Sequence, residues 1–208
     1  MPDRPTSIRA ISSEEIRLED LVANRTMSSD IAKTLREIAR AKRPLIVFAL
    51  PRLAGKTTVL RAILAERPAS TPVATFAEDG EDVEQLLKQS AGGYLVIPEI
   101  AKGAARPGYI WGEDVRRIFK TVKDDVSLAA TLHADGPEDA FAQICEGCGV
   151  PDAEAAKIRY AVHLRSIGRW EEPTRRVVQS VNAIEGVRDG KPQLKPLHRW
   201  DEQNDRFI

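Results

Sequence analysis

The chain has 208 residues, of which 42% are hydrophobic and 30% charged, values typical of a soluble globular protein with one buried core. Its 31 basic side chains balance its 31 acidic ones, which excludes the strongly basic surface of a nucleic-acid-binding domain. The first ten residues, MPDRPTSIRA, lack the apolar core of a signal peptide, and no long apolar segment follows. We therefore expect a cytoplasmic protein that neither binds nucleic acid nor inserts directly into a membrane.

The N-terminal part of the chain predicts a short strand and then a helix. Thr6–Ile11 is typical of the strand. Ser28 can cap a following helix, in which Ile31, Leu35 and Ile38 recur at helical spacing. Pro44 ends this helix, because proline cannot continue its hydrogen bonding.

The next stretch predicts a buried strand followed by a helix. Leu45 to Leu50 is an unbroken apolar run, too short to cross a membrane and of the right length for a strand. The later apolar residues lie on one helical face, and they are Val59, Leu60, Ile63 and Leu64.

Between these two elements, Gly55-Lys56-Thr57 matches the end of a phosphate-binding loop. Glycine allows the backbone to approach a phosphate, and the first N–H groups of a helix favour its negative charge. Lys56 would reach the β- and γ-phosphates, and the Thr57 hydroxyl would bind Mg²⁺. The alternative is an ordinary strand–turn–helix, because Leu50 stands where the full pattern has glycine and Pro51 lacks an N–H donor.

Two further predicted strands end at acidic residues. Val73–Phe76 leads to Glu78 and its acidic neighbour, and Tyr94–Ile97 leads to Pro98 and Glu99, with a short helix from Asp82 to Gln89 between them. An apolar strand followed by an acidic residue has the form of a Walker B segment, whose carboxylate orients or activates water. Acidic residues also follow many ordinary strands, so the residues alone leave both interpretations open.

The segment after the loop Lys102–Gly108 predicts a helix, a strand and a second helix. The first helix has Val115, Ile118, Phe119 and Val122 on one face. The strand Ser127–Leu132 runs into His133, and a single histidine at a strand end favours a structural role. Asp135 and Glu138 resemble a capping box at the start of the helix Pro137–Cys148. Cys145 and Cys148 then lie on one packed helix face, which the spacing favours over a metal or redox site.

The C-terminal part predicts a short helix and then β structure. The helix runs from Asp152 to Tyr160, and a turn at Asp189 and Gly190 joins the last two strands. The strands are Ala161–Leu164, Arg175–Ile184 and Gln193–Trp200. The sequence therefore predicts an α/β fold, with a mostly parallel sheet flanked by helices and an antiparallel β tail.

The order of these motifs resembles the type II/type IV secretion and pilus-assembly ATPase family. SLAATLHADGPEDAFAQI is similar to its His box, LVIPEI to its Walker B strand, and DGKPQLKPLHRWD to its final hairpin. The resemblance implies a RecA-like P-loop core. It also implies that residues 1–25 form an N-terminal arm, with a remnant strand and a linker, and that residues 26–208 form the ATPase domain.

The resemblance also assigns roles to individual residues. It implies that Glu99, Glu78 and His133 are catalytic. Thr57 would hold Mg²⁺ together with the nucleotide. The nucleotide, ATP, would be bound by Leu53, Ala54, Gly55, Lys56, Thr57, Thr58 and Arg9.

The function implied is an ATP-binding and ATP-hydrolysing motor of a secretion or pilus-assembly system. Its partners would be copies of itself in a ring or a related ATPase subunit, and an inner-membrane platform protein at which it is peripheral. The family carries arginines that reach the nucleotide between the positions of Glu78 and Glu99, and this chain has none there. Arg52, inside the loop, is a candidate to take their place. The alternative is a degenerate relative that binds nucleotide weakly or not at all and acts as a regulatory or structural subunit. A small P-loop kinase is a third class, for which the His box gives no reason.

Overall fold

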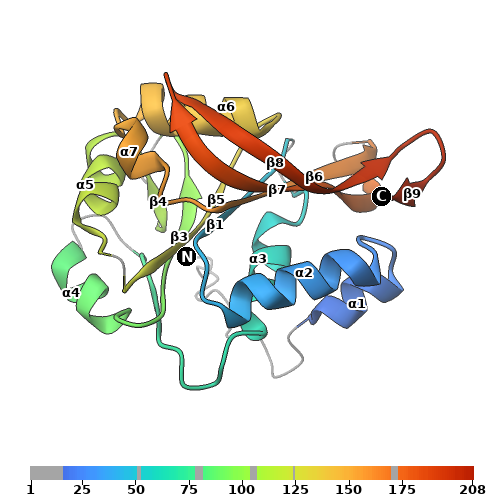
Figure 1. Ribbon diagram of the computed structural model, residues 1–208, viewed down its shortest axis with the longest axis horizontal. Coiled ribbons are helices and arrows are strands. Elements are labelled where there is room, and N and C mark those ends of the chain that lie inside the picture. Colours follow the sequence, from blue (N-terminus) through green and yellow to red (C-terminus); the bar gives the residue numbers. More distant parts are fainter. Residues whose placement is uncertain (1–15, 51–52, 78–81, 104–106, 124, 170–172) are drawn as a thin grey trace, which may run out of the picture.

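The computed structural model describes residues 16–50, 53–77, 82–103, 107–123, 125–169 and 173–208. In this part of the chain a single twisted sheet runs through the molecule, with helices on both of its faces (Figure 1). The strands lie in the order β2-β3-β5-β1-β6-β7-β8-β9, and β4 pairs with β3. The predicted strand Thr6–Ile11 lies outside the described residues.

The helices are mostly short, and the two longest strands, β7 and β8, lie in the C-terminal part of the chain. The helices are α1 Leu18–Ala23, α2 Ser29–Arg40, α3 Lys56–Ala65, α4 Val83–Gln89, α5 Glu113–Thr121, α6 Pro137–Ala142, the π-helix η1 Gln143–Gly147 and α7 Asp152–Ala155. The strands are β1 Leu45–Phe48, β2 Val73–Thr75, β3 Tyr94–Ile100, β4 Tyr109–Ile110, β5 Ser127–Leu132, β6 Tyr160–Gly168, β7 Pro173–Arg188, β8 Lys191–Asp201 and β9 Arg206–Phe207.

The parallel strands form the buried centre of the sheet. β1 pairs in parallel with β5 on one side and with the start of β6 on the other. Every residue of β1 and of β5 is buried, which explains why both are apolar runs without polar alternation. The predicted fold class, a mostly parallel sheet flanked by helices with antiparallel C-terminal strands, is confirmed.

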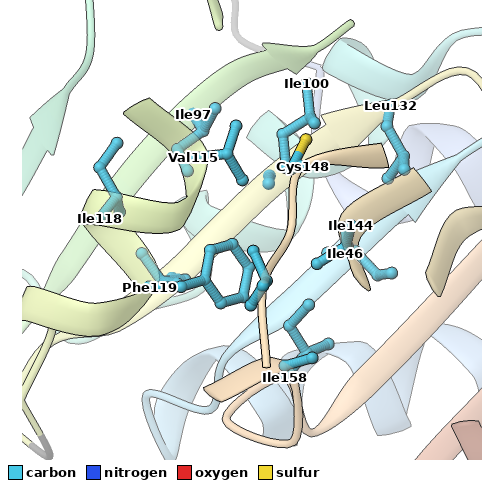
Figure 2. Close-up of a cluster of buried hydrophobic side chains, with 14 of the residues drawn as sticks. Ile46, Ile97, Ile100, Val115, Ile118, Phe119, Leu132, Ile144, Cys148 and Ile158 are labelled. Atoms are coloured by element: carbon cyan, nitrogen blue, oxygen red, sulfur yellow. The ribbon is translucent and has the colours of Figure 1, made fainter. Parts of the chain in front are cut away.

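Alternate side chains of β1 face two separate hydrophobic clusters. Leu45 and Val47 pack with α1, α2 and α3 on one face of the sheet. Ile46 and Phe48 pack on the other face with residues of β3, α5 and the segments that follow β5. Figure 2 shows this second cluster around Phe119, with the side chains of β3, β5, α5 and η1 in contact. The two clusters fix the position of the loop that follows β1, because they hold both the strand before it and the helix after it.

The C-terminal strands form an antiparallel ribbon that continues the sheet (Figure 1). The predicted turn is confirmed: Asp189 and Gly190 join β7 to β8 with positive φ angles of 51° and 71°. The carboxylate of Asp152 accepts hydrogen bonds from the N–H groups of both turn residues, at 2.7 and 3.0 Å. This contact anchors the hairpin to the start of α7.

Three local predictions are wrong. The strand predicted to end at Ile97 continues to Ile100, because β4 pairs with its last residues; a register shift between Ile97 and Ile100 accommodates the proline. The capping box is not formed: Gly136 is the N-cap of α6 without a side-chain hydrogen bond, and the Asp135 N–H donates to Asp139 instead.

The third concerns the helix predicted from Asp152 to Tyr160, which is α-helical only to Ala155. The predicted helix Pro137–Cys148 is confirmed as far as Gly147, with α6 continuing directly into the π-helix η1. Within the described residues, no helix combines the length and the apolar character needed to span a bilayer.

Candidate nucleotide site

The loop after β1 has the local geometry of a phosphate-binding loop at its C-terminal end. Gly55 is the N-cap of α3 and has a φ of 91°, a left-handed conformation that glycine adopts without strain. Lys56, Thr57 and Thr58 form the first turn of this ten-residue helix, where the N–H groups have no partner within the helix. This end of α3 therefore offers the donors and the positive dipole end that an anion requires.

Three of the predicted residues meet beside this helix start. Lys56 comes from α3, Glu99 from β3, and His133 from the residue after β5. Lys56 Nζ lies 3.1 Å from His133 Nδ1 and 3.5 Å from Glu99 Oε2, and His133 Nε2 lies 3.9 Å from Glu99 Oε1. The Lys56 and Glu99 side chains are only 6% and 8% exposed, so their charges interact with little screening by water.

Two residues that the sequence analysis did not select hold this group in place. The Thr131 hydroxyl lies between the Pro98 carbonyl and Glu99 Oε2, 3.1 Å from the latter. The Gln143 side-chain amide donates to the His133 carbonyl at 2.6 Å. Thr131 is fully buried within an apolar strand. A polar residue there, two positions before His133, was the signal by which the sequence could have indicated it, because a buried hydroxyl needs a hydrogen-bond partner.

A cavity of about 870 Å³ opens in front of the helix start, within the range of small-molecule sites. Its lining comes from the loop and α3, from the catalytic candidates, from the region of α1, and from β7. The lining residues are Ile16, Leu21, Asn24, Thr26, Leu53, Ala54, Gly55, Lys56, Thr57, Thr58, Val59, Glu99, Tyr109, His133, Thr174, Arg175 and Arg176. One open space thus contacts every predicted nucleotide-binding residue that the structure describes.

The structure adds two arginines to this cavity that the sequence analysis did not assign to it. Arg176 on β7 donates from Nε to the Leu53 carbonyl at 2.9 Å. Its neighbour Arg175 binds Asp205 and the Arg25 carbonyl. In the sequence these arginines appear only as a pair at the start of a predicted strand. Their position beside the loop depends on how the distant strand β7 is placed in the sheet, which local sequence does not indicate.

Three residues named in the sequence analysis lie outside the described residues. Arg9, Arg52 and Glu78 are all in segments that the structure does not describe. Their predicted roles at the nucleotide stay predictions.

Cys145 lies in η1, and Cys148 is the C-cap residue that ends it. Cys148 is buried in the hydrophobic core, and its Sγ accepts a hydrogen bond from the Gly112 N–H at 3.3 Å. Burial raises the pKa of the Cys145 thiol to about 11 and also raises the pKa of Cys148. Both sulfurs are therefore neutral thiols at pH 7, a state that disfavours nucleophilic or metal-ligand chemistry.

The site brings four kinds of functional group together. It has helix N–H donors, a buried ammonium group, a buried carboxylate and a histidine ring. An ammonium group and helix N–H donors bind phosphate, whereas a carboxylate held by a threonine can accept a proton from water. The arrangement can therefore bind a polyphosphate and supply a general base beside it.

Comparison with known proteins shows the fold. No protein-family model matches the chain, and neither does any curated protein. Among solved structures, the VirB11 ATPase from the Brucella suis type IV secretion system, in complex with sulphate, is 16% identical, with a TM-score of 0.52 over 84% of this chain and 58% of that one. The Yersinia pseudotuberculosis ATPase DotB is 9% identical, with a TM-score of 0.52 over 78% and 47% of the two chains. The chain thus shares the fold of the matched part of these proteins and spans about half their length.

Proposed function

We propose that the chain binds MgATP at the start of α3 and hydrolyses it, as the ATPase core of a secretion or pilus-assembly motor. The observation that carries this proposal is the meeting of Lys56, Glu99 and His133 at the phosphate-binding loop. These residues come from three separate segments. Along the chain these segments follow the order of a P-loop, a Walker B strand and a His box.

The ligand-free contacts indicate how binding and hydrolysis would be linked. The Lys56 ammonium now lies between Glu99 and His133. Bound β- and γ-phosphates would attract this ammonium, because they carry more negative charge than the single carboxylate. Glu99 would then be released to accept a proton from the attacking water, while Thr131 keeps the carboxylate in place.

The residues present also fit a magnesium ion that arrives with the nucleotide. Thr57 lines the cavity and is exposed, and a hydroxyl oxygen is the kind of hard ligand that Mg²⁺ prefers. Within the described part of the chain, no group of three or more His, Cys, Asp and Glu residues could hold a metal alone. The ion would therefore take its other ligands from phosphate and water, and its role would be to neutralise charge on the phosphates.

The VirB11 comparison supports an oxyanion site in this fold, because that structure contains sulphate, an anion of phosphate's shape. We also propose, from the motifs that the chain shares with the secretion ATPase family, that it assembles with copies of itself or a related ATPase subunit, at an inner-membrane platform protein. We propose residues 26–208 as the ATPase domain and residues 1–25 as an arm. Arg9 and Glu78 would complete the site in the roles that the sequence assigns to them.

One observation favours the second candidate function, a binding-only regulatory subunit. Leu53 has a φ of 65°, where most non-glycine residues are strained, so the loop is held at a cost that a glycine would avoid. Such a loop could bind nucleotide weakly. The two functions differ in turnover, because only the ATPase uses Glu99 as a base.

Substitution of Lys56 and Glu99 separates these functions. Lys56→Ala removes the charge that contacts phosphate, so we expect MgATP affinity by calorimetry to fall about 10- to 100-fold. Glu99→Gln retains the shape of the side chain, so binding stays close to wild type while phosphate release falls by about 10²–10⁴-fold. Lys33→Ala, on the exposed face of α2, is the control for lysine removal.

Two outcomes would contradict the proposal. Equal phosphate release by wild type and Glu99→Gln, after controls for contaminating ATPases, would leave only the binding function. Equal MgATP affinity in wild type and Lys56→Ala would overturn the nucleotide site itself. Thermal melting of each variant shows whether it is folded.

A further inference from the structure

The phosphate-binding loop contains a leucine in a conformation that favours glycine. Leu53 has a left-handed φ of 65°, and Gly55, two residues later, has a φ of 91°. The Leu53 side chain is 67% exposed, so burial does not compensate for the strained backbone. Something else must stabilise this turn of the loop.

One side chain contacts both left-handed residues. Arg176 donates from Nε to the Leu53 carbonyl at 2.9 Å. A Cβ placed on Gly55 would lie only 3.1 Å from Arg176 Cδ, so the aliphatic part of the arginine covers the glycine closely. The charged donor makes this hydrogen bond stronger than one between neutral groups.

The strand that carries Arg176 is well anchored. Its next residue, Val177, is fully buried and pairs with Arg165 on β6. Its preceding residue, Arg175, binds Asp205 and the Arg25 carbonyl. The arginine therefore reaches the loop from a part of the sheet that does not depend on the loop for its own structure.

We infer that Arg176 is a positioning residue that holds the phosphate-binding loop in its anion-binding shape, through its Nε hydrogen bond to Leu53. The inference rests on the proposed nucleotide site. If Leu53 relaxes to a right-handed φ, the chain direction changes, and the N–H groups of Ala54, Gly55 and Lys56 no longer point at one phosphate. Arg176, on a distant strand, thus stabilises a backbone conformation that a glycine at position 53 would adopt without strain.

Two substitutions of nearly equal length test this inference. Glutamine has an N–H₂ group at the same distance along the side chain as arginine Nε, so Arg176→Gln retains the donor and loses the charge. Arg176→Met has the same number of side-chain atoms up to that point and no donor. We expect MgADP affinity, measured by calorimetry, to fall about tenfold in Arg176→Met and less than about threefold in Arg176→Gln. Arg165→Met, which removes an arginine paired with Glu202 on the same ribbon, should leave the affinity unchanged.

A measurement without nucleotide tests the loop directly. The backbone ¹³C chemical shifts of Leu53 report its φ, and they should leave the left-handed range in Arg176→Met but not in Arg176→Gln. Equal losses of affinity in the two variants, with Leu53 unchanged, would overturn the inference, because they would assign Arg176 only a charge effect. If even the wild type fails to bind MgADP, the proposed function fails, and the Leu53 shifts still decide whether Arg176 holds the loop.

Discussion

The parallel strands and the antiparallel ribbon of this sheet are stabilised in different ways. β1 and β5 are buried along their whole lengths, between helices on both faces. β8 is exposed or half-buried at every position but Trp200, and its end is held by hydrogen bonds and ion pairs between side chains. The parallel part therefore depends on apolar burial, whereas β8, in the outer part of the ribbon, depends more on polar contacts.

The candidate site lies where these two parts meet. Lys56, Glu99 and His133 belong to the parallel part, and Arg176 reaches the same cavity from the ribbon. The buried part fixes the chemical groups rigidly, and the ribbon supplies the contact to the loop. Substitutions in the ribbon should therefore disturb the positions of Lys56, Glu99 and His133 less than they disturb the loop.

Removal of a large side chain from the parallel part should have the largest effect on stability. Phe48 is fully buried, and its ring stacks on His163 with the centroids 5.0 Å apart. We expect Phe48→Ala to lower the free energy of unfolding in urea by about 3–5 kcal/mol, because it leaves a cavity that packed neighbours cannot fill. Leu194→Ala, at a half-buried position of β8, is the matched change in the ribbon and should cost only about 1 kcal/mol. Equal losses would show that the ribbon is as tightly packed as the parallel strands.

The ribbon should instead be sensitive to the loss of one carboxylate. Asp205 accepts hydrogen bonds from Arg175 and Trp200 Nε1, and it pairs with Arg25 near the end of α1. The hydrogen bond from Arg175, followed by that from Trp200, lowers the pKa of Asp205 below its usual 3.8. The stabilisation is therefore present above that value and is lost as the pH falls through the lower pKa of the folded state.

We expect Asp205→Asn to destabilise the protein at pH 7 by less than Phe48→Ala does. The difference from wild type should shrink as the pH falls below about 4, because the unfolded wild type then takes up a proton at Asp205 that the folded wild type takes up only at lower pH. Urea unfolding at pH 7, 5 and 3.5 measures this, with Glu202→Gln as a control on the same ribbon. A difference that stays constant with pH would show that shape, rather than charge, makes Asp205 important.

The difference between the two parts also explains what the sequence could predict. Ser127–Leu132 is a strand with the predicted bounds, because burial on both faces leaves an apolar run that is visible locally. Glu99 and His133 were selected because each follows such a run. The extension of β3 through Glu99 was missed, because it depends on pairing with β4, a two-residue strand without a signal of its own.

The contacts between the two parts were the least predictable. Arg176 lies 123 residues from Leu53 in the sequence, and neither residue indicates the other by type or spacing. A positive φ at a leucine also has no signature in the sequence, since the residue type argues against it. Thr131 and Gln143 support the predicted residues from within ordinary helix and strand patterns. The residues that meet at the site could therefore be predicted from local motifs, but their supporting contacts could not.

The smallest expected effect concerns His163, which lies at the boundary between the two parts. It pairs with Phe48 in parallel and with Ser180 across the antiparallel ribbon. Burial lowers the pKa of His163 below its usual 6.5; Arg165 acts in the same direction, and Asp135 opposes them. The unfolded chain therefore takes up a proton near pH 6.5 that the folded chain does not, so this histidine makes the protein less stable as the pH falls below 6.5.

His163→Phe should remove that part of the pH dependence while retaining a ring against Phe48. In urea unfolding at pH 8, 7, 6 and 5, we expect the wild type to lose more stability than the variant below pH 6.5, by up to about 1.4 kcal/mol per pH unit. His198, whose pKa is also lowered by burial, is present in both proteins and cancels from the comparison. Parallel curves for the two proteins would mean that His163 takes up its proton in the folded state. The boundary between the parallel strands and the ribbon would then be open to water, contrary to the burial that the structure shows.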